Sequence, residues 1–226
     1  MRLCESAGGG RGLLRAAVGI VALAAPAVGT ASASAATIAV TQPCYVNANP
    51  AQGAPIAVVG SGFTPGDTIA IQGSGVSATA TASPSGQILV GTAGPILNTS
   101  GPASQTFTLS AIDQTISSAT LATTSVTMAN LSVATKPAVA RPTRKVTWQF
   151  SGFTPGKTVW IHYLRKRVVN RMSFGRANGP CGMLTAKRPF YPGGHPRFTK
   201  YTVVIDQVKR YSKGARPRIK TTLSFF

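Results

Sequence analysis

Side chains that could perform acid–base, nucleophilic or metal chemistry are scarce in this sequence. The chain has four acidic residues, two histidines and three cysteines. Beyond the N-terminal stretch, the acids are Asp67, Asp113 and Asp206, which lie too far apart to predict the paired carboxylates of a glycosidase. His162 and His195 lack metal-ligand spacing with a cysteine or an acid. We therefore expect no catalytic residues, no metal and no cofactor, and interpret the chain as a non-enzyme.

Basic residues are instead abundant, and they concentrate in the second half of the chain. None of the 23 Lys and Arg residues lies between Thr37 and Thr135, whereas 20 lie from Lys136 onward, where Asp206 is the one acid. Charge that cannot be paired internally favours a polyanionic partner. We hypothesise binding to a cell-wall polymer, acidic polysaccharide or extracellular DNA, without specific nucleic-acid readout. The predicted contact residues are Arg165, Lys166, Arg167, Lys209, Arg210, Lys213, Arg216 and Arg218.

An alternative explanation for this charge remains open. The basic residues could be generic surface charge of a structural, spacer or adhesion protein that has no specific ligand. A contiguous basic face would favour the binding hypothesis, and scattered basic residues would favour the structural one.

A further candidate contact lies on the strand predicted to follow residue 157. If Val159 and Ile161 face the core, the alternation of a strand places Trp160 and His162 on the other face. A Trp beside a His on a polar face can stack on a sugar ring or pack against a partner. The alternative is that this face is covered by a neighbouring strand or by a domain junction.

The first 35 residues have the pattern of a secretory signal peptide. Three arginines precede an apolar run from Ala16 to Val28, which is too short for a stable membrane anchor. Small residues then permit cleavage after Ala33 or Ala35. We expect the mature chain to be extracellular, without a transmembrane segment, and either released or held at the cell surface by non-covalent contacts.

The same six residues, SGFTPG, occur at positions 61–66 and 151–156. In each copy, Pro and Gly are suited to a type II turn, and the Phe is placed to plug the end of a core. A second pair of anchors, AIDQ at 111–114 and VIDQ at 204–207, has a similar offset. Short Val, Thr and Ile runs between Gly, Pro and Asn are typical of strands. The sequence predicts a duplicated all-β unit of about ninety residues.

The segments GSGFTPGDTIAI and FSGFTPGKTVWIHY resemble bacterial immunoglobulin-like domains of secreted and cell-surface proteins from high-GC bacteria. The resemblance implies a fold, and roles such as spacing, adhesion or carbohydrate binding, but no shared catalytic residues. We therefore expect two tandem immunoglobulin-like β-sandwiches after a cleaved signal peptide. The expected divisions are the signal at 1–35, a sandwich without Lys or Arg at 36–134, and a strongly basic sandwich at 135–226.

Two cysteines, Cys44 and Cys181, would remain after cleavage, one in each predicted domain. Export permits a disulfide between them. In an immunoglobulin-like arrangement, Cys44 falls near the end of the first strand and Cys181 in a turn at the N-terminal pole of the second sandwich. These poles meet in an end-to-end tandem, which favours an inter-domain disulfide. The alternative is two separate buried thiols.

Overall fold

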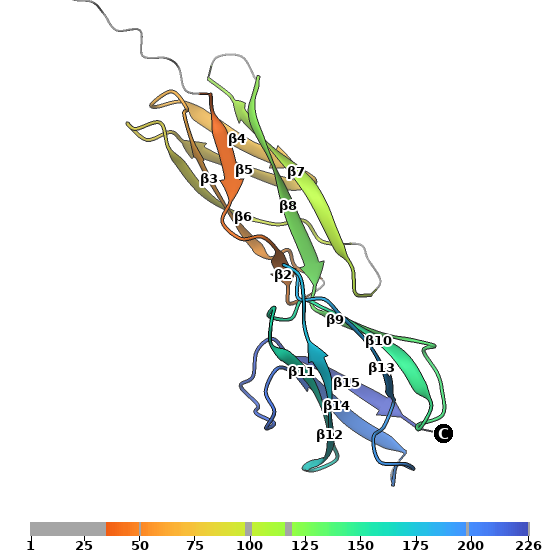
Figure 1. Cartoon of the computed structure of the whole chain (residues 1–226). Helices are drawn as coiled ribbons and strands as arrows, with labels where there is room; N and C mark the ends of the chain where they lie inside the picture. Colours follow the sequence, from red (N-terminus) through yellow and green to blue (C-terminus); the bar gives the residue numbers. More distant parts are fainter. Residues whose placement is uncertain (1–34, 50, 98–100, 116–118, 198, 226) are drawn as a thin grey trace, which may run out of the picture. The chain divides into compact units, whose positions relative to one another are not determined.

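The computed structural model of the chain describes residues 35–49, 51–97, 101–115, 119–197 and 199–225, and all regular elements in these ranges are β-strands (Figure 1). The expected signal peptide, apart from its last residue, lies outside the described residues. Within the described ranges, no helix has the length and apolar character needed to cross a membrane.

The first eight strands form two sheets, which we call the first sheet pair. The strands are β1 (Thr37–Val40), β2 (Tyr45–Asn47), β3 (Pro55–Ser61), β4 (Thr68–Gly73), β5 (Val76–Thr81), β6 (Ile88–Ala93), β7 (Ser104–Asp113) and β8 (Thr120–Asn130). One sheet has the order β1-β3-β6 and the other β2-β8-β7-β4-β5. All neighbours are antiparallel except β2, which pairs with β8 in parallel.

The remaining seven strands form the second sheet pair. They are β9 (Ser132–Lys136), β10 (Lys145–Ser151), β11 (Thr158–Leu164), β12 (Val168–Arg176), β13 (Leu184–Pro189), β14 (Lys200–Asp206) and β15 (Ile219–Ser224). The sheet orders are β13-β10-β9 and β12-β11-β14-β15, with antiparallel neighbours throughout. Read in chain order, these orders repeat those of the first pair. The exception is β2, which has no counterpart among the described strands.

The two SGFTPG motifs form the same turn, as the sequence predicted. The backbone N–H of Asp67 donates to the carbonyl of Thr64 at 3.2 Å, and that of Lys157 donates to the carbonyl of Thr154 at 3.3 Å. The glycine of the turn has a φ of 87° in the first copy and 78° in the second. A proline followed by a glycine at positive φ defines a type II turn.

The phenylalanine before each turn closes a core. Phe63 is 4% exposed and Phe153 is 1% exposed. Their backbone N–H groups donate to the carbonyls of Gly86 and Gly182, at 3.1 and 3.4 Å respectively. The repeated SGFTPG motif therefore specifies both a type II turn and a buried phenylalanine ring.

The aspartate of the second repeated motif caps the following turn in both copies. Asp113 Oδ1 accepts from the backbone N–H of Thr115 at 2.7 Å, and Asp206 Oδ1 accepts from that of Val208 at 2.9 Å. Both carboxylates are buried. This arrangement is the local side chain-to-backbone bond that aspartate commonly makes in turns.

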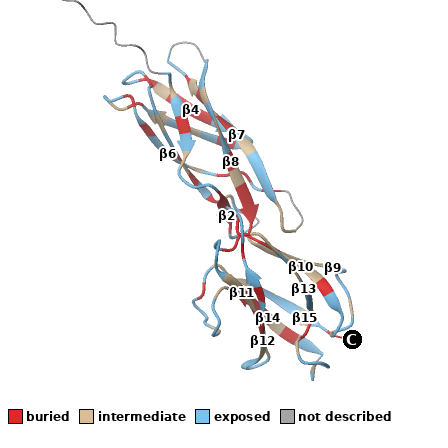
Figure 2. Ribbon diagram, viewed as in Figure 1, coloured by how far each residue is buried: buried red, intermediate tan, exposed pale blue. Residues whose placement is uncertain are grey.

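Each sheet pair encloses its own core (Figure 2). The core of the first pair is mainly aliphatic, and its largest fully buried members include Ile56, Ile69, Ile71, Leu109 and Met128. The core of the second pair is largely aromatic. It contains Trp148, Phe150, Phe153, Tyr163, Phe174, Phe190, Tyr191, Tyr201 and Phe225.

The chain passes from one sheet pair to the other at Leu131, because β8 ends at Asn130 and β9 begins at Ser132. The sequence placed this division slightly later, between residues 134 and 135. A disulfide joins Cys44 to Cys181, with the Cα atoms 5.3 Å apart. The chain is thus held together at this point both by its backbone and by a covalent cross-link.

Candidate anion-binding site

The acidic side chains of the described residues are buried. The three carboxylates are those of Asp67, Asp113 and Asp206, which are 7%, 6% and 0% exposed. Most of the Lys and Arg side chains of the second sheet pair are exposed. The side chains that this half presents to solvent therefore give it a strongly positive surface, which attracts anions.

Some of these cations surround a hollow of about 660 Å³ in the second sheet pair, which we call the cationic hollow. Its charged lining comes from the β11–β12 turn and from the segment between β13 and β14, and its apolar surface includes two buried tyrosines. The principal lining residues are Arg165, Lys166, Arg167, Tyr191, His195, Arg197 and Tyr201. Exposed Arg and Lys side chains can hold an anionic group through charge-assisted hydrogen bonds.

The β11–β12 turn positions three of these cations. The backbone N–H of Arg165 donates to the carbonyl of Arg167 at 3.1 Å, which closes the chain between the two paired strands. Arg165, Lys166 and Arg167 are exposed in this turn. All three cations of this turn line the cationic hollow.

Two side chains from the sheet hold the opposite wall of the hollow. The Tyr163 hydroxyl donates to the carbonyl of Phe190 at 2.5 Å, and Asn170 Nδ2 donates to the carbonyl of Pro192 at 2.7 Å. Burial is the main factor that raises the pKa of Tyr163 well above its usual value, so its hydroxyl remains a donor. These bonds fasten the segment that carries His195 and Arg197.

A second hollow of about 580 Å³ adjoins the cationic hollow, since His195 and Arg197 line both. Arg141 adds a further cation to the second hollow. Sequence reasoning did not select Arg141, His195 or Arg197, because they lie in irregular segments without periodicity. The PGGHPR sequence around His195 is typical of a turn and carries no binding signal of its own. Together the two hollows form a basic tract that is lined by Arg141, Arg165, Lys166, Arg167 and Arg197.

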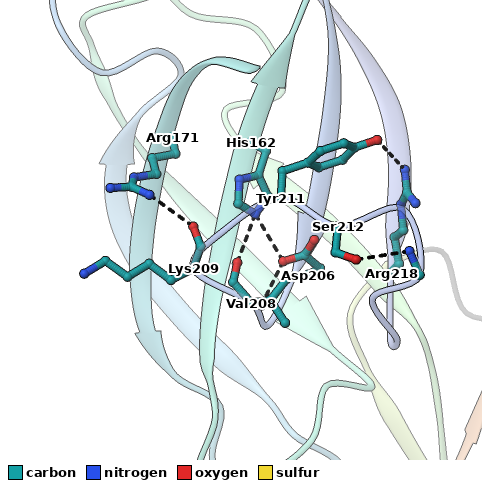
Figure 3. Close-up of polar contacts among 9 residues, drawn as sticks. His162, Arg171, Asp206, Val208, Lys209, Tyr211, Ser212 and Arg218 are labelled. Atoms are coloured by element: carbon teal, nitrogen blue, oxygen red, sulfur yellow. Dashed lines mark hydrogen bonds and ion pairs between the residues drawn. The ribbon is translucent and has the colours of Figure 1, made fainter. Parts of the chain in front are cut away.

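The other predicted cations lie in the segment from Gln207 to Arg218, which we call the basic segment (Figure 3). Lys209, Arg210 and Lys213 are exposed there. Arg218 has an internal role, because its guanidinium nitrogens donate to the Lys213 carbonyl at 2.6 Å and to the Tyr211 hydroxyl at 3.3 Å. The eight predicted cations therefore divide between the turn at the cationic hollow and this separate segment.

The prediction that His162 is exposed on the outer face of its strand is wrong. His162 is 0% exposed, because the basic segment folds back over it (Figure 3). Its Nε2 lies 3.2 Å from Asp206 Oδ1 and 3.1 Å from the Val208 carbonyl, and the Tyr211 ring lies edge-on at 5.8 Å. Both neighbours of Nε2 are acceptors, so this nitrogen carries a proton. The residue fastens the basic segment to the sheet and is not a ligand contact.

Trp160 lies on the same strand and is half-buried. It pairs with Ser173 of β12 on one side and with Asp206 of β14 on the other. The patch predicted from Trp160 and His162 does not form as an exposed pair. The alternative expected this face to be covered by a strand or a domain junction, whereas the element that covers His162 is the basic segment.

No three His, Cys, Asp or Glu side chains of the described ranges come close enough together to hold a metal ion. Asp206, the one acid of the second sheet pair, is 0% exposed and lies 3.2 Å from His162 Nε2. The arrangement of the described site can therefore attract and hold anions, and its chemistry is that of Arg, Lys and His donors.

No protein-family model and no curated protein matches the chain. Several solved structures are similar over most of its length. One is a Ca²⁺-stabilised adhesin that helps an Antarctic bacterium bind ice, at 16% identity and a TM-score of 0.32, covering 84% of this chain and 48% of the other. Another is a four-fold tandem repeat from the extending region of a large adhesion protein, at 15% identity and a TM-score of 0.29, covering 84% and 49%.

A third similar structure is a DUF3823 family protein from Bacteroides ovatus, at 12% identity and a TM-score of 0.26, covering 85% of this chain and 99% of the other. The chain spans about half the length of each of the two adhesion proteins that it matches. These TM-scores are too low to support an argument about function, which has to come from the site itself.

Proposed function

We propose that the chain is an exported, non-catalytic protein whose basic half binds an anionic polymer through the cationic hollow and the tract that continues from it. The observation that carries this proposal is the clustering of cations around one hollow in a chain whose described carboxylates are all buried. The polymer is a cell-wall polymer, an acidic polysaccharide or extracellular DNA. If the polymer is DNA, the protein does not recognise a base sequence, because contacts to a charged backbone carry no sequence information.

We further propose that the two sheet pairs are tandem immunoglobulin-like β-sandwiches, exported by the N-terminal signal peptide and located outside the cell. The repeated strand order and the repeated turns support a duplicated sandwich. The disulfide between Cys44 and Cys181 supports export, since such bonds persist in oxidising compartments.

The binding mechanism is electrostatic. Arg side chains can bind phosphate, sulfate or carboxylate groups in a bidentate manner, and each neutralised group of a polymer releases condensed counterions. Cations that lie within a Debye length of one another, about 10 Å at 0.1 M salt, act jointly on a polymer that carries several charges. Affinity for a polymer should therefore greatly exceed affinity for a single small anion and should fall as salt rises.

The test compares the mature chain with two variants of equal charge. The site variant is Lys166→Gln/Arg167→Gln/Arg197→Gln. The control variant is Lys157→Gln/Arg176→Gln/Lys187→Gln, which removes three exposed cations that do not line the cationic hollow. Each protein is titrated calorimetrically with a poly(glycerol phosphate), an acidic polysaccharide and DNA at two salt concentrations.

We expect wild-type affinity to fall at least about tenfold between roughly 50 and 200 mM salt. The site variant should bind about tenfold to a hundredfold more weakly than the control variant and show a shallower salt dependence. Equal losses of affinity in both variants would mean that binding depends on the total charge of the protein and not on the cationic hollow. Salt-independent binding would exclude the electrostatic mechanism.

A structural or adhesion role without a specific ligand is the second candidate. It is favoured by the disulfide, which fastens two sheet pairs together as a spacer would require. This role predicts no binding of any of the three polymers at physiological salt, and a phenotype that depends on the cross-link and not on the cations.

A further inference from the structure

A hollow of about 850 Å³ lies beside the disulfide and shares no lining residue with the cationic hollow. Cys44 forms part of its wall. Most of the other lining side chains are apolar, and they come from segments far apart in the sequence: Val46, Leu131, Phe153, Pro155, Pro180 and Pro217. We call this the junction hollow. Its volume lies within the usual range for small-molecule sites.

The walls of the junction hollow are held in place by covalent and steric contacts. The disulfide fixes Cys44 to Cys181, whose carbonyl accepts from the backbone N–H of Gly152 at 2.9 Å. A Cβ atom on Gly152 would lie 2.7 Å from both Leu131 Cα and Val46 Cγ1, so the backbone is packed closely there. A hollow with such walls is already formed before a ligand arrives, which lowers the entropic cost of binding.

The charged lining of this hollow consists of cations alone: Arg216, Arg218 and Lys220. Arg218 is committed to the Lys213 carbonyl and the Tyr211 hydroxyl. Arg216 uses one terminal nitrogen on the Ala215 carbonyl at 2.9 Å, which leaves its other guanidinium donors for a ligand. Lys220 is exposed. An anionic head group would therefore meet Arg216 and Lys220.

We propose that the junction hollow binds an amphipathic anion, in which an apolar chain carries a phosphate, sulfate or carboxylate head. The apolar surface of the hollow contacts the apolar chain of the ligand, and the two available cations, Arg216 and Lys220, bind its head group. Neither half of the ligand alone is therefore sufficient for tight binding. This site is distinct from the polymer site and does not depend on it. Lipid head groups and free amphiphiles share this chemistry, and the experiment separates the two sources.

The experiment measures binding of dodecyl phosphate to the mature chain by isothermal titration calorimetry, below the concentration at which the probe forms micelles. Inorganic phosphate and dodecyl maltoside serve as probes that lack the chain or the charge. Octyl phosphate tests the apolar contribution, because each buried methylene should raise affinity about fourfold. Vesicles that contain an anionic lipid test whether a membrane-held head group is also accepted.

We expect one equivalent of dodecyl phosphate to bind at least tenfold more tightly than either control probe, and octyl phosphate to bind more weakly than dodecyl phosphate. The variant Arg216→Gln/Lys220→Gln, which changes two exposed residues, should bind dodecyl phosphate at least tenfold more weakly than the wild type. The variant Lys166→Gln/Arg167→Gln/Arg197→Gln should retain wild-type affinity for it. Binding of vesicles but not of free dodecyl phosphate would overturn the hollow as the site. So would uptake of several equivalents, equal affinity for dodecyl maltoside, or an unchanged affinity in the Arg216 and Lys220 variant.

The outcome is independent of the polymer measurements. If polymer binding fails and one equivalent of dodecyl phosphate binds as expected, the junction hollow stands without the proposed function. If polymer binding depends on Lys166, Arg167 and Arg197 but dodecyl phosphate does not bind, only the further site is lost.

Discussion

The two sheet pairs share a strand order and differ in nearly everything that the strands carry. Both contain the same turn hydrogen bonds after β3 and β10 and the same aspartate caps after β7 and β14. The first pair has an aliphatic core and no Lys or Arg, whereas the second has an aromatic core and a basic surface. One strand order thus carries two different sets of side chains, so a functional difference between the two pairs has to come from their side chains and loops.

The connections between strands show where the divergence matters. The β4–β5 turn consists of Ser74 and Gly75, while the corresponding β11–β12 turn carries Arg165, Lys166 and Arg167. After β14, the basic segment is long enough to fold back over His162 (Figure 3). The cations proposed to bind anions thus lie in the connections between strands, while the strand pairing matches that of the first sheet pair.

The largest expected effect concerns the cross-link between the two pairs. In the chain-entropy model, a bridge with a sequence separation of 137 stabilises the folded chain by about 4 to 5 kcal/mol. The free energy of unfolding of the variant Cys44→Ser/Cys181→Ser should be lower than that of the wild type by up to about that amount. It should also unfold in two calorimetric transitions, because the aliphatic and aromatic cores are then free to unfold separately. A single transition at the wild-type temperature would show that the bridge does not couple the two pairs.

The next largest effect is a difference in stability between variants of Asp206 and Asp113, which both accept a hydrogen bond from the backbone of the turn that follows them. Asp206→Ala removes the acceptor of both the Val208 N–H and His162 Nε2 at a fully buried position, and should cost about 3 kcal/mol in the free energy of unfolding. Asp113→Ala removes the bond to Thr115 and should cost about 1 kcal/mol.

Urea denaturation of both aspartate variants measures this difference. Equal losses would mean that the histidine contact contributes nothing to stability. Asp206→Ala should also expose the basic segment to limited proteolysis, which Asp113→Ala should not do.

The smallest effect tests what the two pairs have in common. Gly66 and Gly156 have positive φ, and a Cβ atom added at either position would meet nothing within 4 Å. Ala at either position should therefore cost only the backbone strain, about 1 kcal/mol, and equally in both pairs. Denaturation midpoints provide the measurement. Clearly unequal losses would show that the two turns are not equivalent despite their identical sequence.

The parts of the fold that were predictable are those encoded by local chemistry. The SGFTPG turn and the burial of Phe63 and Phe153 follow from Pro, Gly and an aromatic residue in fixed order, so two copies predicted two similar units. The all-β class followed from short β-branched runs. The side-by-side pairing of β2 with β8 was not predictable, because a strand of three residues carries no periodic signal.

The candidate site was predictable in location but not in composition. The uneven distribution of Lys and Arg predicted a site in the second half of the chain, which is also where the cationic hollow lies. His162 was misplaced because alternation along a strand says nothing about a distant segment that covers its outer face. Arg197 and His195 were missed because only the three-dimensional packing of Phe190 and Pro192 against the sheet brings them to the β11–β12 turn.

The burial of Asp67, Asp113 and Asp206 has a consequence for how binding would respond to acid. A typical protein surface carries both signs of charge, so acidification neutralises its carboxylates and makes it more cationic. Here the described exterior has no carboxylate side chain to neutralise, and its lysines and arginines stay charged in mild acid. Acidification therefore removes no positive charge from the described exterior, and a loss of polymer affinity at low pH would report protonation of the polymer.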